Sequence, residues 1–125
     1  MIKLVAFDLD GTIADTIPMC IEAFKQAVSP YASKILSKDD IVKTFGLNEE
    51  GMIKEDVSED WEKALIDFYV KYKEMHTVYI QPFAGIRELI TELKKNSIIV
   101  SLITGKGQRS CDITLHHFEM EARFD

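Results

Sequence analysis

The hydrophobic positions of the chain follow two patterns. Residues 2–7 and residues 98–103 are short apolar runs without helical spacing, and each is followed by a polar turn. Runs of this kind predict parallel β-strands that are buried on both faces. In the other segments, apolar residues recur every three or four positions, which predicts helices. The predicted order is therefore strand, helical segment, helix, strand, helix.

The long segment at residues 16–78 has helical spacing throughout. Ser37 and Asp40 have the spacing of a capping box, which predicts a short helix that Gly46 would stop. Ser58 is expected to cap a longer helix that follows. We interpret the many acidic side chains within residues 49–63 as a solvated helix face.

After a turn near residues 81–85, helices are predicted at residues 86–96 and 108–117. His116 and His117 lie near the end of the last helix, and a surface position beside the helix dipole is favoured over metal binding. The aromatic residues of the long segment could line a substrate pocket, but their helical spacing favours packing in its core. These residues are Trp61, Tyr69 and Tyr72.

Composition narrows the class of protein. The 125 residues suit one domain, and Leu, Ile, Val and Phe make up about 30% of them, enough for a hydrophobic core. The net charge of −6 argues against nucleic acid or an anionic membrane as a partner. No apolar run suits a signal peptide or a membrane span. Cys20 and Cys111 form no metal motif, although a single disulfide between them is a possibility that the sequence leaves open. We expect a cytoplasmic protein.

The first chemical signal comes directly after the first predicted strand. Asp8 and Asp10 lie two residues apart, at the sheet edge where open α/β folds bind ligands. Their mutual repulsion would be relieved by a divalent cation, and hard carboxylate oxygens suit Mg²⁺. Gly11 would let the backbone turn close to a ligand. The alternative is that Asp10 only caps a turn, because Asp-Gly is a common turn dipeptide.

The second signal follows the second predicted strand. If the two strands are neighbours, Thr104 lies at the same sheet edge as Asp8. Its hydroxyl group and the backbone amides of Gly105 and Lys106 could hold phosphate oxygens. An ordinary helix N-cap at Thr104 is the alternative, and this segment alone does not decide between them.

Two motifs in this order resemble those of the haloacid dehalogenase (HAD) superfamily. Residues 7–16, FDLDGTIADT, are similar to its first motif, and residues 101–106, SLITGK, to its second. The helical insert between them and the Pro-x-x-Gly-Ile sequence at residues 82–86 resemble the phosphoglycolate-phosphatase-like branch. The loop Phe45-Gly46-Leu47 lies where the cap of that branch has a specificity loop.

The resemblance implies an α/β fold. Its Rossmann-like HAD core would be incomplete, with two strands from this chain, and would comprise residues 1–14 and 82–125. An all-helical cap would be inserted at residues 15–81. The chain stops at Asp125, before the third and fourth motifs of the family, so we expect it to be truncated.

The resemblance also implies roles for the motif residues. Asp8 would be the nucleophile, Asp10 the general acid and base, and the Asp8 carboxylate with the Asp10 carbonyl would bind Mg²⁺. A carboxylate at position 10 suits phosphate esters rather than halides. The expected function is Mg²⁺-dependent hydrolysis of a small phosphorylated metabolite through an aspartyl-phosphate. The expected phosphate-binding residues are Thr104, Gly105, Lys106, Gly11 and Thr12.

Two alternatives stay open beside this hydrolase. One is a catalytically incompetent fragment or binding module, and the other is a sugar-phosphate mutase of the same fold. None of Lys94, Lys95 and Lys106 can be assigned as the lysine of the third motif. Lys106 is expected to be solvated or to contact substrate. The free apolar edge beside residues 98–103 predicts self-association.

Overall fold

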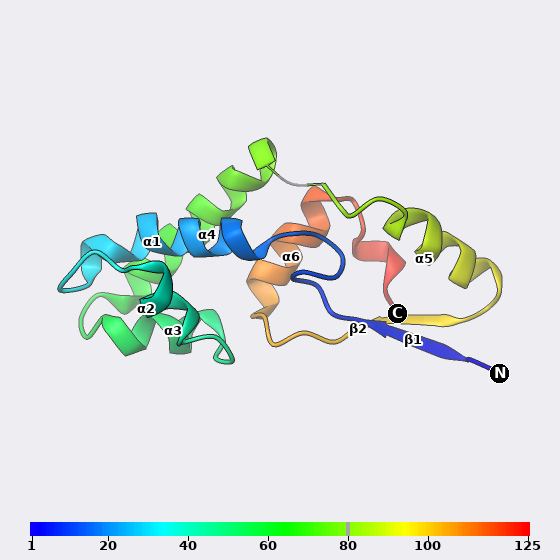
Figure 1. Ribbon diagram of the computed structural model, residues 1–125, viewed down its shortest axis with the longest axis horizontal. Helices are drawn as coiled ribbons and strands as arrows, with labels where there is room; N and C mark the ends of the chain where they lie inside the picture. Colours follow the sequence, from blue (N-terminus) through cyan, green and yellow to red (C-terminus); the bar gives the residue numbers. More distant parts are fainter. Residues whose placement is uncertain (80) are drawn as a thin grey trace.

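The structure is a computed structural model that describes residues 1–79 and 81–125; Ile80, within the expected cap, lies outside the described residues. Its element order confirms the predicted succession of strand, helical segment, helix, strand and helix (Figure 1). The elements are β1 (Leu4–Phe7), α1 (Ile17–Val28), η1 (Ser29–Tyr31), α2 (Lys38–Val42), α3 (Glu49–Asp56), α4 (Trp61–Tyr79), α5 (Ile86–Lys95), β2 (Ile99–Leu102), α6 (Gln108–His117) and η2 (Glu121–Arg123).

The two strands of the described residues form a parallel pair. Leu4 lies opposite Ile99 and Phe7 opposite Leu102, so both strands end at the same edge, as predicted. The prediction that both faces are buried is wrong, because Leu4 and Ile99 are half exposed while Phe7 and Val100 are buried. Two strands offer too little area for helices to cover both faces.

The outer edge of β2 is partly paired. The backbone N–H of Asp125 donates to the carbonyl of Val100 at 2.7 Å, and the Asp125 carboxylate accepts from the Val100 N–H at 2.9 Å. These bonds satisfy both backbone groups of Val100, a buried residue for which unpaired groups would be costly.

Some of the helix boundaries predicted from local sequence signals are confirmed and others are wrong. The capping box is confirmed, since Ser37 Oγ accepts from the Asp40 N–H at 3.1 Å and the Asp40 carboxylate accepts from the Ser37 N–H at 2.9 Å. The helix it starts ends at Val42, before Gly46. Ser58 is not the cap of the long helix, which begins at Trp61, because Asp60 has a left-handed backbone (φ 60°) that helical structure cannot include.

The acidic run at residues 49–63 contains a separate helix, α3, that the sequence analysis did not distinguish. The Asn48 side chain caps it by accepting from the Gly51 N–H at 2.9 Å. The prediction of a wholly solvated face is wrong for Glu49, which is only 5% exposed. Glu50, the next residue, is partly exposed and forms an ion pair with Lys54 along the helix surface.

Aromatic side chains form the centre of the helical segment. Phe24, Phe68 and Tyr72 are buried, with ring centroids 5.8 Å apart for the first pair and 5.5 Å apart for the second. Trp61 and Tyr69 pack against this cluster. Their interpretation as packing residues is confirmed. Burial of several large rings is a major source of stability for a segment this small.

The helical segment leaves and rejoins the strand region at one place. Ala14 forms an isolated bridge with Pro82, and the Phe83 N–H donates to the carbonyl of Ile13 at 2.8 Å. Figure 1 shows α1–α4 gathered on the side away from the N-terminus, β1, β2 and α5 on the other, and α6 between them.

The structure also describes the two cysteines, His116 and the lengths of the helices. Cys20 and Cys111 are both free thiols. His116 is exposed and lies 2.9 Å from Glu121, in agreement with a surface role. Among residues 1–79 and 81–125, no helix is both long and apolar enough to cross a membrane.

Candidate active site

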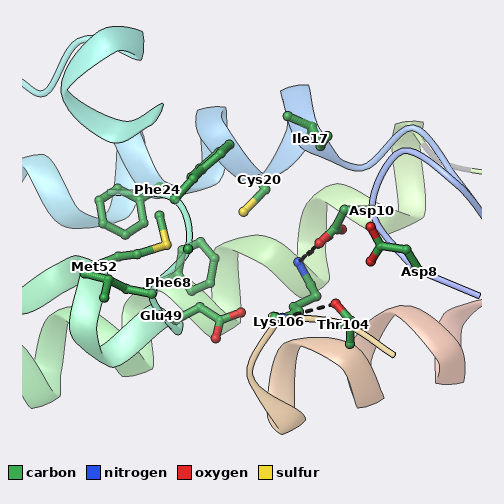
Figure 2. Close-up of a pocket in the computed structure, with 14 residues that line it drawn as sticks. Asp8, Asp10, Ile17, Cys20, Phe24, Glu49, Met52, Phe68, Thr104 and Lys106 are labelled. Carbon is green, nitrogen blue, oxygen red and sulfur yellow. Dashed lines mark hydrogen bonds and ion pairs between the residues drawn. The ribbon is translucent and has the colours of Figure 1, made fainter. Parts of the chain in front are cut away.

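A cavity of about 250 Å³ lies where the strands end and the helical segment begins (Figure 2). Its polar side is formed by residues that follow the two strands, namely Asp8, Asp10, Thr104, Gly105 and Lys106. The parallel register explains this grouping, since it brings the polar turns after β1 and β2 to one edge. Most of the site residues predicted from sequence are therefore together.

The two aspartates differ in their surroundings. Asp8 is exposed, and one carboxylate oxygen accepts from the Leu9 N–H at 2.8 Å. Asp10 is partly buried and accepts from the Thr16 hydroxyl and the Lys106 ammonium. Thr16 stands at the N-cap position of α1 without capping it, because its hydroxyl donates to Asp10 instead. This use of Thr16 was not predicted, although the residue belongs to the first motif.

Lys106 is the main departure from the sequence prediction. Its side chain is 4% exposed, and Nζ lies 3.3 Å from both carboxylate oxygens of Asp10 and 4.5 Å from the ring centroid of Tyr72. A solvated side chain is thus excluded. Burial alone would lower the pKa of Lys106, but its interactions with Tyr72, Cys20 and Asp10 outweigh burial and raise the pKa, so the side chain is an ammonium at neutral pH.

The turn after β2 is not a simple helix cap. Helix α6 begins at Gln108 with Gly107 at its N-cap position, so the N-cap alternative for Thr104 is wrong. The Thr104 hydroxyl oxygen instead accepts from the Lys106 N–H at 3.1 Å, which shapes the turn. Thr104 lines the same cavity as the two aspartates, and its role in phosphate binding stays a prediction.

Gly11 and Thr12 lie outside the residues that line the cavity. They form the tight turn after Asp10, in which the Gly11 N–H donates to the Ala14 carbonyl at 2.8 Å. Gly11 has a left-handed backbone (φ 78°), so a glycine suits this turn. Thr12 is exposed. Their predicted role in phosphate binding stays a prediction, and their observed role is to shape the loop that carries Asp10.

Glu49 reaches the cavity from the helical segment and was missed by the sequence analysis. It is the first residue of α3, and its Oε2 atom accepts from the Gly107 N–H at 2.9 Å. A Cβ atom on Gly107 would overlap the Glu49 carboxylate, so the glycine makes this approach possible. The contact joins the helical segment to the first turn of α6, where partial positive charge favours a carboxylate.

The remaining wall of the cavity is largely apolar. Figure 2 shows Phe24, Met52 and Phe68 grouped on the side away from Asp8. The loop Phe45-Gly46-Leu47 also lines the cavity, at the place where the family resemblance puts a specificity loop. Burial raises the pKa of Cys20 to about 11, so this thiol is protonated at neutral pH and is no nucleophile there.

A buried histidine contacts Tyr72, whose ring in turn contacts Lys106. His76 is 1% exposed, with Nδ1 at 2.6 Å from the Tyr72 carbonyl and Nε2 at 2.9 Å from the Thr114 hydroxyl. Burial lowers the pKa of His76, which favours the neutral ring. Tyr72 lies one helical turn before His76 in α4, and the Lys106 ammonium lies over the face of its ring.

The donors beside the cavity suit a hard cation such as Mg²⁺. The predicted ligands, the Asp8 carboxylate and the Asp10 carbonyl, are oxygen atoms, which Mg²⁺ prefers. Among residues 1–79 and 81–125, no three His, Cys, Asp or Glu side chains are grouped so that they could hold a metal ion together. The two predicted donors therefore provide only part of an octahedral shell.

Residues 5–125 match the family model of haloacid dehalogenase-like hydrolases. The chain belongs to this family. Among curated relatives, it is 28% identical over 127 residues to a putative pyrophosphatase PpaX from Caldanaerobacter subterraneus subsp. tengcongensis, and 26% identical over 126 residues to the pyrophosphatase PpaX of Bacillus mycoides. These matches cover 99% of the chain but only 56% and 58% of the relatives, so the chain spans little more than half their length.

Solved structures confirm the fold. CbbY from Rhodobacter sphaeroides in complex with phosphate superimposes with a TM-score of 0.81 at 18% identity, over 100% of this chain and 62% of CbbY. A predicted phosphoglycolate phosphatase from Haemophilus somnus gives a TM-score of 0.76 at 20% identity, over 99% of this chain and 60% of that protein. The haloacid dehalogenase α/β fold predicted from the two motifs is therefore confirmed.

Proposed function

We propose that the chain carries the nucleophile, the acid and base, and part of the phosphate site of a Mg²⁺-dependent phosphomonoester hydrolase. The observation that carries this proposal is the meeting of Asp8, Asp10 and Thr104 at one end of a parallel strand pair, beside a cavity. Membership of a hydrolase family supports it. In this proposal residues 1–14 and 82–125 form the catalytic core, and residues 15–81 form the cap.

The proposed reaction proceeds in two steps. In the first, a carboxylate oxygen of Asp8 attacks phosphorus, the ester P–O bond breaks, and Asp10 donates a proton to the leaving oxygen. In the second, Asp10 takes a proton from water, whose oxygen attacks the aspartyl-phosphate. This attack breaks the bond between phosphorus and Asp8 and releases inorganic phosphate. Mg²⁺ supplies charge neutralisation at the transferring phosphoryl group when bound.

The contacts of Asp10 hold its side chain in place. The Thr16 hydroxyl and the Lys106 ammonium donate to its carboxylate and fix its orientation. The exposed carboxylate of Asp8, by contrast, accepts one backbone N–H and is accessible to an incoming phosphate. Accessibility is what a nucleophile requires, and a fixed orientation is what a residue that moves a proton requires.

A second candidate is a phosphate-binding module without turnover. The partial metal shell and the coverage of about 56–62% of its relatives favour this candidate for the 125 residues alone. Loss of a phosphate-binding lysine and of metal-binding acids typically costs several kcal/mol each in the barrier. We therefore expect the 125-residue chain to hydrolyse an aryl phosphate at least about 10⁴ times more slowly than an active relative.

The decisive experiment uses a longer form of the protein that hydrolyses a generic aryl phosphate with Mg²⁺. Asp8→Asn is expected to abolish turnover, and Asp10→Asn to slow both formation and hydrolysis of the aspartyl-phosphate. Asp39→Asn, which removes an exposed carboxylate on α2, is the matched control and leaves the rate unchanged. Retained turnover in the Asp8 variant would overturn the covalent mechanism.

A further inference from the structure

The cavity has an uneven distribution of charge. Among its described lining residues, the strand side contributes Asp8, Asp10 and Lys106, and the helical segment contributes one charged group, Glu49. The rest of the helical side is largely apolar, as Phe24 illustrates. A substrate whose phosphoryl group contacts Asp8 therefore extends its leaving group toward apolar side chains and a carboxylate.

The position of Glu49 is fixed by the fold. Its carboxylate is held by the Gly107 N–H, and the absence of a side chain on Gly107 gives it the space to approach. Figure 2 shows the carboxylate between Lys106 and Phe68. The group therefore lies inside the cavity and is not a surface charge that could turn away into solvent.

We propose that Glu49 is a specificity-determining residue that selects the charge of the leaving group. This inference rests on the proposed phosphatase function. A leaving group with a second phosphate or a carboxylate would lie close to the Glu49 carboxylate in a cavity lined largely by apolar side chains, and like charges there repel. The favoured substrates are phosphate monoesters whose leaving groups are apolar and either uncharged or cationic.

The proposal separates this chain from two kinds of substrate. Pyrophosphate, from which the pyrophosphatase relatives take their name, has a phosphate as its leaving group and is disfavoured. A sugar bisphosphate, which a mutase must hold, requires a cation for its second phosphate. The cavity offers a carboxylate there instead. Its volume of about 250 Å³ is below the usual range for drug-sized ligands, which suits a small metabolite.

Binding measurements on the 125-residue chain test this proposal without requiring turnover. The probes are phenyl phosphate and 4-carboxyphenyl phosphate, which differ by one carboxylate on the leaving group, each titrated with excess Mg²⁺. NMR shifts of the Gly105 and Lys106 amides report binding at the proposed phosphate site. We expect the wild-type chain to bind the carboxylated ester about tenfold more weakly. Glu49→Gln should reduce that difference to within about twofold.

Controls separate the local effect from the net charge. Glu50→Gln removes the same charge from the adjacent residue, whose side chain is 45% exposed, and should leave the tenfold difference intact. If Glu49→Gln fails to fold, the wild-type chain still provides a test. In that case 4-(aminomethyl)phenyl phosphate, with a cationic leaving group, must bind more tightly than phenyl phosphate.

Each result is decisive. Equal binding of the two esters by the wild-type chain, or a tenfold difference that persists in Glu49→Gln, overturns the role of Glu49 and leaves the proposed phosphatase function standing. Failure of phenyl phosphate to shift the Gly105 and Lys106 amides at all overturns the proposed phosphate site, and the inference with it.

Discussion

The ion pair between Lys106 and Asp10 permits a quantitative test of how the site is held together. Lys106→Met removes the ammonium but keeps most of the aliphatic side chain, so packing against Tyr72 is largely preserved. The variant leaves Asp10 with a single strong side-chain donor, the Thr16 hydroxyl. We expect a loss of stability, because an incompletely paired carboxylate in a partly buried site is costly.

The magnitude follows from distance and exposure. Opposite charges 3.3 Å apart attract by roughly 5 kcal/mol at an effective dielectric constant of about 20, and desolvation offsets much of this gain. The Lys106 side chain is 4% exposed but that of Asp10 is 25% exposed, so water can partly replace the lost ammonium. Breaking a fully buried pair costs about 3–5 kcal/mol and an exposed pair about 0–1 kcal/mol. We therefore expect Lys106→Met to cost about 2 kcal/mol.

Urea unfolding followed by circular dichroism gives the free energy of unfolding for the wild-type chain, Lys106→Met, Asp10→Asn and the double variant. The double-mutant cycle should yield a coupling energy of about 1–2 kcal/mol. Because the pKa of Lys106 is raised, the stabilisation is complete below its ordinary pKa near 10.5 and is lost only at higher pH. The coupling energy should therefore be equal at pH 7 and pH 9. A value below about 0.3 kcal/mol would refute the reasoning.

Three further predictions concern metal, thiol and sheet edge. Calorimetry should find Mg²⁺ affinity in the millimolar range, because the Asp8 carboxylate and the Asp10 carbonyl form only part of an octahedral shell. A micromolar site would contradict this. Burial raises the pKa of Cys20 from about 9 to about 11, so the contribution of the protonated thiol to folding stability is complete below pH 9 and is lost as pH rises through 11. Cys20→Ala should therefore flatten the fall in unfolding free energy between pH 9 and pH 11. An unchanged slope would refute the assignment. Light scattering should detect oligomers, because Leu4 and Ile99 expose about half their surface. Ile99→Lys should reduce this association. A monodisperse wild-type monomer would contradict the prediction.

The sequence predicted the main elements because their signals are local. Residues 98–103 have no helical spacing, and the capping box at Ser37 and Asp40 depends on groups three residues apart. The first motif placed Asp8 and Asp10 correctly because both lie within three residues of the end of β1. The prediction that Ser58 caps the long helix is wrong because Asp60 has a left-handed backbone. This feature is local too, but an aspartate in the sequence does not indicate it.

Lys106 and Glu49 could not be placed from sequence for the opposite reason. Lys106 lies 96 positions from Asp10, and their contact exists only once the two strands pair. Glu49 lies 58 positions from Gly107, and their contact exists only once the helical segment packs against the start of α6. In the sequence, Glu49 is one of many acidic residues in a run that reads as solvent-exposed. A weak indication existed at Gly107, since a second glycine two residues after Gly105 marks a place where another group can approach the backbone.

The charges within the cavity explain why a cation is central to the proposed function. Among the described residues, the lining contains the three carboxylates of Asp8, Asp10 and Glu49 and one ammonium, that of Lys106, which is already paired with Asp10. A phosphate monoester brings further negative charge to a site whose own groups sum to negative. Phosphate binding by these residues alone is therefore opposed electrostatically, and it becomes favourable when Mg²⁺ or additional cationic groups neutralise the phosphoryl oxygens. In our proposal, Glu49 and Asp8 repel the substrate without such a cation, and with it the Glu49 carboxylate opposes only an anionic leaving group.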